Sequence, residues 1–277
     1  MKFPTIFVNH GGGPLPLMGK QPDLVHHKQE VVKLLPSKPT SIVVLSAHWE
    51  ANPIEISTFT GPQHLLFDYN GFPPETYKYD YPAPGNPKLS QRIKDLLQEE
   101  GIPSILEQSR GLDHGVFVPL KIMVPDADIP VVAVSLAASL DAEENMKIGR
   151  ALSPLRDEGV LILGSGYTFH NMRSFFHPTK ESFQASKDFN EWLKETISET
   201  LSSSSSPPSP ERMKDRLIHW TKAPGARMCH PREEHLIPLF MVAAASDFSP
   251  GKVVYDSTTT NNNNMDGNHG VTGYMFY

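Results

Sequence analysis

Cysteine is nearly absent from this chain of 277 residues, which holds a single copy, Cys229. One cysteine excludes an intrachain disulfide framework and a cysteine-rich zinc site, and it favours a reducing compartment. Long apolar runs are also lacking, since no stretch reaches the 18 or so apolar residues that a membrane-spanning helix needs. The first residues show no basic segment followed by a long apolar one, so a secretory signal is not expected. These absences predict a cytoplasmic protein that does not span a membrane.

An excess of basic residues is lacking as well. The chain has 25 Lys and Arg against 31 Asp and Glu, which gives a net charge of −6. A nucleic-acid surface would need basic residues clustered on one face, and here they are scattered, so we expect no nucleic-acid partner. Hydrophobic residues make up 39% and charged residues 20%, a balance typical of a globular protein with a sizeable core.

Continuous apolar runs rich in β-branched residues predict strands that are buried on both faces. Such runs cover residues 41–47, 129–136 and 159–164, with shorter ones at 6–8 and 271–276. Helical patterns lie between or after them, at 24–35, 86–100, 141–157, 180–201, 211–221 and 233–246. Alternating strands and helices predict an α/β fold in which helices cover both faces of a mostly parallel central sheet. A ligand site is then expected at the carboxyl ends of the strands.

Local signals mark several helix ends and loops. Asp23 is the expected N-cap of the first helix, and Pro87 and Gly101 bracket the second in the usual asymmetric way. The run at 202–210, SSSSSPPSP, predicts a flexible surface loop, and the asparagines at 261–264 predict an exposed turn. Neither run divides the chain, so we expect one domain over residues 1–277.

Histidines follow three of the predicted strands. His10 opens the glycine-rich turn HGGGP after the first, His48 ends the second, and His170 follows the run at 159–164. Neutral imidazole is a common ligand of iron and zinc, so this pattern indicates a metal site, with histidines that merely complete a turn or a core edge as the structural alternative. A phosphate-binding loop is a poor fit because no Gly-Lys-Ser/Thr follows the glycines.

Two further histidines have a suggestive context. His114 lies between glycines next to Asp113, which is a candidate N-cap for a helix beginning near Val116, and a capping turn explains this context equally well. His235 and its neighbour Glu234 precede an apolar helix and are candidates for a third metal ligand. The simpler explanation of the glutamate is that it complements the helix dipole.

Taken together, these motifs carry a family resemblance. They are HGGGP (10–14), SAHWE (46–50), YPAPGNPKL (81–89), GLDHGVFVPLKIM (111–123), DADIPVVAVSL (126–136), GRALSPLRDEGVLILGSG (149–166), HN (170–171) and HPREEHLIPL (230–239). In this order, and over nearly the whole chain, the sequence resembles the class III extradiol ring-cleaving dioxygenases, specifically the 4,5-DOPA dioxygenase-like branch. It departs from many members at the first motif, where they read HGSP or HGNP, and the extra small residue lies in the expected pocket wall.

The resemblance implies roles for the histidines. His10, His48 and His235 match the metal ligands, with Glu234 as a rival to His235. His170 matches a histidine beside the metal that is either the catalytic acid/base or a fourth ligand. His114 matches a histidine that faces the substrate and stabilises charge during catalysis.

The resemblance also implies an activity. It is the opening of a catechol-type aromatic, L-DOPA-like molecules included, by O₂ to a semialdehyde, with both oxygen atoms incorporated. One divalent metal is required, Fe(II) for activity, and Zn(II) can occupy the same imidazole ligands in purified protein. Two alternatives use the same residues: a zinc-dependent hydrolase, and a non-enzymatic binding protein on the same scaffold.

Overall fold

A central sheet organises the molecule, of which the computed structural model describes residues 2–198, 209–258 and 269–277. In this part of the chain the sheet has eight strands in the order β4-β3-β5-β2-β6-β1-β8-β7. The four central strands run parallel to one another: β5 (Val131–Ala137), β2 (Ser41–Ala51), β6 (Val160–Gly166) and β1 (Thr5–Asn9). The predicted mostly parallel sheet is therefore confirmed.

The outer strands bring antiparallel pairing to the sheet. On one side β8 (Thr272–Phe276) pairs antiparallel with both β1 and β7 (Gly251–Asp256). On the other, β3 (Ile54–Ser57) pairs antiparallel with β5 and parallel with β4 (Ser104–Glu107). The sequence did not predict β3, β4 or β7. The edge strands β4 and β7 are only partly buried and lack a continuous apolar run. The strand β3 is largely buried but has only four residues, one of them a glutamate.

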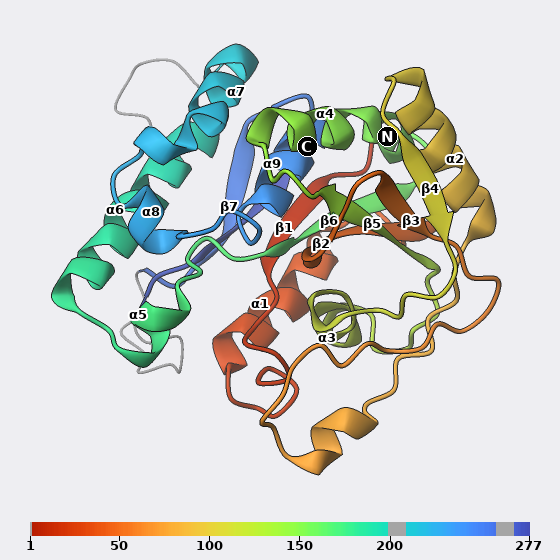
Figure 1. The fold of residues 1–277 in the computed structure, drawn as a ribbon, viewed down its shortest axis with the longest axis horizontal. Helices are drawn as coiled ribbons and strands as arrows, with labels where there is room; N and C mark the ends of the chain where they lie inside the picture. The colour runs from red at the N-terminus through yellow and green to blue at the C-terminus, as the bar shows by residue number, and fades with distance from the viewer. Residues whose placement is uncertain (1, 199–208, 259–268) are drawn as a thin grey trace.

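Helices cover both faces of the sheet, as predicted. Figure 1 shows α4 (Ala142–Ala151) and α9 (Ile237–Ala245) on one face, and α1 (Pro22–Val31) and α3 (His114–Met123) on the other. The remaining helices are α2 (Pro87–Glu99), α5 (Met172–Phe176), α6 (Lys180–Ile197), α7 (Pro210–Ile218) and α8 (Ala226–Cys229). Short 3₁₀ turns occur at Val32–Leu34, Pro74–Lys78, Ser153–Arg156 and Trp220–Lys222.

The core consists of two apolar layers, one on each face of the sheet. Along β2, Ile42 and Val44 belong to one layer, whereas Val43 and Leu45 belong to the other, and all four are fully buried. Successive side chains of a strand point to opposite faces. Two buried faces therefore explain why the sequence of this strand is continuously apolar rather than alternating.

Two predicted helix starts are corrected by the structure. The first helix begins at Pro22, with Gln21 rather than Asp23 at the N-cap position, because proline is well suited to the first helical position. The last helix begins at Ile237 rather than residue 233, with Pro238 in its first turn, so the preceding glutamates lie in a turn outside it. The second helix agrees with its prediction, since the Asn86 side chain caps it and Gly101 follows it.

Two predicted loops fall largely outside the described residues. The asparagine run at 261–264 lies outside them entirely, and so does 202–208. The last two residues of the predicted loop at 202–210 begin α7: Pro210 is its first residue, and Ser209 is its N-cap, whose hydroxyl accepts a hydrogen bond from the backbone N–H of Arg212. Among the described residues no helix is both long and apolar enough to cross a membrane.

Candidate metal centre and active site

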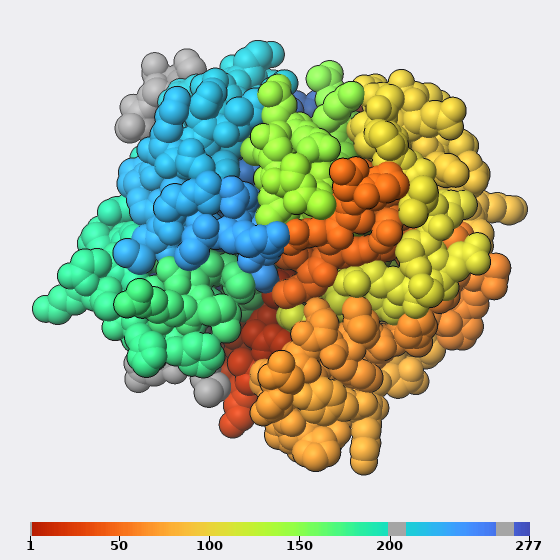
Figure 2. Space-filling model, in the orientation of Figure 1, coloured from red at the N-terminus to blue at the C-terminus, as the bar shows by residue number. Residues whose placement is uncertain are grey.

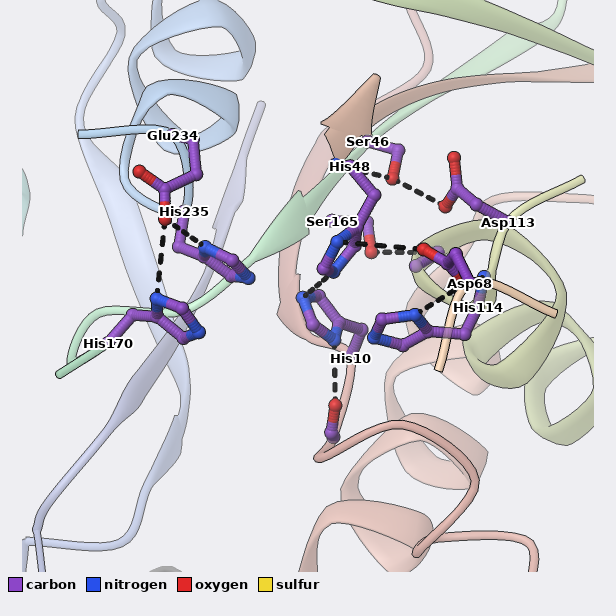
Figure 3. Close-up of polar contacts among 12 residues, drawn as sticks. His10, Ser46, His48, Asp68, Asp113, His114, Ser165, His170, Glu234 and His235 are labelled. Atoms are coloured by element: carbon purple, nitrogen blue, oxygen red, sulfur yellow. Dashed lines mark hydrogen bonds and ion pairs between the residues drawn. The ribbon is translucent and has the colours of Figure 1, made fainter. Parts of the chain in front are cut away.

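Five histidines meet at the edge of the sheet where β1 and β6 end, beside β2 (Figure 3). His10 follows β1 directly, and His170 follows β6 after a short loop. His114 is the first residue of α3, and His235 lies in the turn before α9. His48 does not end its strand as predicted. It lies inside β2, where the pairing with β5 shifts register, and this irregularity lets the strand continue past the site.

The donor atoms of these histidines form two adjacent groups. The ligand atoms of His10, His48 and His114 lie within 4.8 Å of one another, and so do those of His170, Glu234 and His235. The two groups are in contact, because the ring centroid of His235 is 4.9 Å from that of His48 and 5.3 Å from that of His10. All the site residues predicted from the sequence are therefore gathered here, although His10, His48 and His235 are divided between the two groups.

The Nδ1 atoms of two histidines are held by oxygen acceptors. His10 Nδ1 lies 2.8 Å from the carbonyl oxygen of Gly11, and His235 Nδ1 lies 2.9 Å from Oε1 of Glu234. We assign a proton to each Nδ1, because a carbonyl or a carboxylate oxygen only accepts. The lone pair is then on Nε2, and His235 Nε2 is buried with no hydrogen-bond partner. A buried acceptor without a partner is costly, and a bound cation would satisfy it.

A second contact brings two ligand atoms together. The Nε2 atoms of His10 and His48 are 3.3 Å apart, which is hydrogen-bond distance. A proton on His48 Nε2 satisfies this contact in the metal-free protein, and a metal ion bound by both nitrogens would replace that proton. The residues present therefore fit a divalent metal bound by imidazole nitrogens.

Burial keeps these rings in the form that binds metal. Loss of solvent, with repulsion from the neighbouring imidazoles as the smaller cause, lowers the pKa of His10 and of His235 well below the ordinary value. Burial likewise lowers the pKa of His48 to about 3. These histidines are neutral at physiological pH, and neutral imidazole is the ligand form.

Two carboxylates each support a pair of histidines. Asp68 accepts hydrogen bonds from the backbone N–H (2.9 Å) and from Nδ1 (2.8 Å) of His114, and its other oxygen lies 3.7 Å from His48 Nδ1. Besides bonding His235, Oε1 of Glu234 lies 3.4 Å from His170 Nδ1. Burial alone would raise the pKa of each carboxyl group, but the histidine contacts outweigh it and lower both pKa values. Both carboxylates are thus ionised and orient imidazole rings.

Asp113 has a different role from the predicted one. It occupies the N-cap position of α3, but its side chain makes no capping hydrogen bond. Its carboxylate instead accepts a hydrogen bond from the Ser46 hydroxyl (2.7 Å) and pairs with Arg110 (3.3 Å), which also donates to the carbonyl oxygen of His48 (2.9 Å). Through these contacts Asp113 connects α3 to the stretch of β2 that carries His48. Burial raises the pKa of Asp113.

The backbone of β6 fixes the position of His235. The N–H of Tyr167 donates to the carbonyl oxygen of His235 at 2.8 Å, and a Cβ atom added to Gly166 would lie 2.1 Å from that same oxygen. The approach is possible because glycine has no side chain. Glycine at this position thus determines how closely the His235 turn approaches the other histidines.

A substitution tests this packing. We expect Gly166→Ala to displace the His235 turn, to destabilise the protein by about 1–3 kcal/mol through overpacking, and to weaken metal binding. Gly149→Ala is the matched control, because its Cβ would lie 2.2 Å from the carbonyl oxygen of Met241 at the α4–α9 contact. Urea unfolding measures the loss of stability in both variants, and metal titration measures the loss of metal affinity, which we expect only in Gly166→Ala. Equal metal affinities in the two variants would contradict the proposed role of Gly166.

Next to the histidines is a cavity of about 640 Å³. In Figure 2 the red N-terminal segment is visible at the bottom of a depression between the green and orange segments. Besides the histidines, the cavity is lined by Gly11, Gly12, Gly13, Leu15, Gln21, Tyr69, Phe72, Tyr167, Met172, Phe175 and Phe176. The glycines of HGGGP thus form part of the cavity wall.

Several site residues were not found from the sequence. Asp68, Tyr69 and Phe72 belong to an irregular segment between β3 and the 3₁₀ turn at Pro74–Lys78, where no periodic pattern draws attention to them. Tyr167 had a usable signal, because it follows a predicted strand end and comes three residues before His170. Its ring centroid lies 5.0 Å from that of His10.

Buried histidines also predict how stability depends on pH. Burial lowers the pKa of His27, His48 and His230 to about 3, against about 6.5 in an unfolded chain. Below pH 6.5 the unfolded state binds more protons, so the free energy of unfolding falls as the pH falls toward 3. Each such histidine contributes up to about 1.4 kcal/mol per pH unit.

Urea unfolding of the metal-free protein at several pH values measures this slope. His230→Phe should reduce it, and a slope unchanged by that substitution would contradict the prediction.

Comparison with known proteins identifies the family of this site. Residues 4–266 match the family model described as the catalytic LigB subunit of aromatic ring-opening dioxygenase. The chain belongs to the class III extradiol dioxygenases. It is 35% identical to the 4,5-DOPA dioxygenase extradiol of Beta vulgaris, with 91% of each chain covered. It is 32% identical to the protein of the same name from Escherichia coli, covering 89% of this chain and 86% of that one.

A fungal relative and a solved structure extend the comparison. The dioxygenase tasH of Hapsidospora irregularis is 36% identical, over 88% of this chain and 78% of its own length. The crystal structure of an uncharacterized Escherichia coli protein matches with a TM-score of 0.74 and 28% identity, each chain being fully covered. The predicted family and enzyme class are thereby confirmed: the chain is an extradiol dioxygenase. Enzymes of this family depend on a metal, and the cluster of His10, His48 and His114 is a place where one can bind.

Proposed function

We propose that this dioxygenase binds one divalent metal through His10, His48 and His235, and uses O₂ to open a catechol-type aromatic to a semialdehyde. The observation that carries the ligand set is the Nε2 atom of His235, which is buried and without a partner beside two Nε2 atoms only 3.3 Å apart. Fe(II) is the metal proposed for activity, and Zn(II) binds the same imidazoles without supporting turnover.

The remaining histidines are proposed to act on the substrate. When bound, Fe(II) supplies Lewis acidity toward the catechol oxygens and open positions for O₂. His170 lines the cavity, and its Nδ1 faces Glu234, so its Nε2 is the group that takes up the phenolic proton and later returns it. His114 lines the cavity from α3, with its Nδ1 held by Asp68, and its Nε2 stabilises charge that develops on the substrate.

Oxygen uptake tests the proposal. The protein is loaded with Fe(II) under anaerobic conditions, mixed with a panel of catechols, and exposed to O₂. We expect one O₂ consumed per catechol, a yellow semialdehyde, and both atoms of ¹⁸O₂ in the product. Protein loaded with Zn(II) is the control and should consume none. The proposal fails if the Fe(II)-loaded protein consumes no O₂ with any catechol.

A further inference from the structure

The cavity is much larger than one aromatic ring requires. Its volume is about 640 Å³, whereas a cavity of about 150 Å³ is enough to hold benzene. It falls within the range of about 300–1,000 Å³ that accommodates drug-sized ligands. A catechol ring placed against the histidines therefore leaves most of the cavity for a substituent.

The walls away from the histidines are mainly apolar. Leu15 lies between β1 and α1, and Phe72 lies just before the 3₁₀ turn at Pro74–Lys78. Met172, Phe175 and Phe176 belong to α5. Met172 is 51% exposed and Phe176 is 72% exposed, and both line the cavity. An apolar substituent that packs against them would cover apolar surface that is otherwise in contact with water.

Positively charged side chains are absent from the described lining of this space. Among the described residues that line the cavity there is no Lys or Arg. Residues 199–208 and 259–268, which the structure does not describe, contain no Lys or Arg in their sequence either. Asp68 and Glu234 beside the histidines are negative, and Arg232, which pairs with Glu234 at 3.4 Å and with Glu50, does not line the cavity. A carboxylate on the substrate would find no cationic partner among the lining side chains, whereas an apolar substituent would leave water by packing against them.

We propose that the cavity selects a catechol with a bulky, uncharged apolar substituent over one whose substituent carries a carboxylate. Phe72, Met172 and Phe176 are the specificity-determining residues, and the substituent lies between them. This inference rests on the proposed function, because it places the diol at the histidines. It goes further by naming the substrate class, and it disfavours amino-acid catechols such as L-DOPA.

Three catechols that differ in their substituent test the selection. We compare 4-butylcatechol with 3-(3,4-dihydroxyphenyl)propionate and L-DOPA, measuring kcat/KM by O₂ uptake and the dissociation constant by anaerobic titration of the Zn(II)-loaded protein. We expect 4-butylcatechol to be favoured by about tenfold or more in both measurements, which corresponds to about 1.4 kcal/mol. Equal or better values for either carboxylate would overturn the inference. Failure of the proposed function is distinct, since no catechol would then consume O₂.

Placing a cation in the wall provides the second test. Phe176→Lys should raise kcat/KM for the propionate relative to 4-butylcatechol by about fivefold or more. The reason is that the substrate carboxylate gains an ammonium partner and can form a charge-assisted hydrogen bond with it. Leu34→Lys is the control, since Leu34 is also exposed but lies outside the cavity lining, and it should leave the ratio unchanged. An unchanged ratio in Phe176→Lys would overturn the assignment of α5 as the specificity wall.

Discussion

Replacing His235 by alanine is expected to weaken metal binding by more than about 100-fold and to reduce turnover below detection. The expected loss is this large because groups that only orient a ligand are themselves worth about 10–100-fold in affinity, and a ligand contributes more. His10→Ala and His48→Ala should behave in the same way. Metal content after dialysis, measured together with the dissociation constant for Zn(II), gives the result for each variant.

The same experiment decides between the two histidine groups. His114→Ala should retain metal, because His114 is proposed to act on the substrate. This variant is informative because the ligand atom of His114 lies in the same group as those of His10 and His48. If His114→Ala lost the metal and His235→Ala retained it, the ligand set would be His10, His48 and His114. Glu234→Gln addresses the rival ligand. As the partner of His235 Nδ1 it should cost about 10–100-fold in affinity, and a loss as complete as that in His235→Ala would make the glutamate a ligand.

The central strands were predictable because burial on both faces leaves a clear pattern in the sequence. Ile42, Val43, Val44 and Leu45 fill both apolar layers, so the middle of this run is continuously apolar. The outer strands have no such constraint. In β4, Ile105 is 44% exposed, and the strand begins and ends with the polar residues Ser104 and Glu107, so its sequence shows no recognisable strand periodicity.

The histidines of the site were predictable for a related reason. The carboxyl ends of parallel strands lie at one edge of the sheet, so His10 and His48 were expected at that edge once the strands were recognised. They come from β1 and β2, which lie on either side of β6. The interactions that orient these histidines could not be predicted from the sequence. Asp68 approaches from a long irregular segment, and the contact of Gly166 with the His235 carbonyl depends on tertiary packing between β6 and the turn before α9. The division of the ligand atoms into two groups is likewise a matter of side-chain direction, which the sequence does not specify.

His170→Gln is expected to lower kcat by about 10²–10⁴-fold while the metal stays bound, since general acid–base catalysis contributes this much. Glutamine keeps a polar side chain in the cavity but cannot take up the phenolic proton. The ring of His170 stacks on that of His235 at a centroid distance of 3.3 Å, so the metal content and the dissociation constant for 4-butylcatechol must be measured in the same preparation.

The pattern across these measurements identifies the role of His170. A fall in kcat with metal content and substrate affinity retained identifies the proton-transfer group. Loss of metal in step with activity would make His170 the fourth ligand, and full turnover would remove it from the chemistry. His177→Gln is the matched control, because His177 is an exposed histidine just after α5 that does not line the cavity, and its kcat should equal that of the unmodified enzyme.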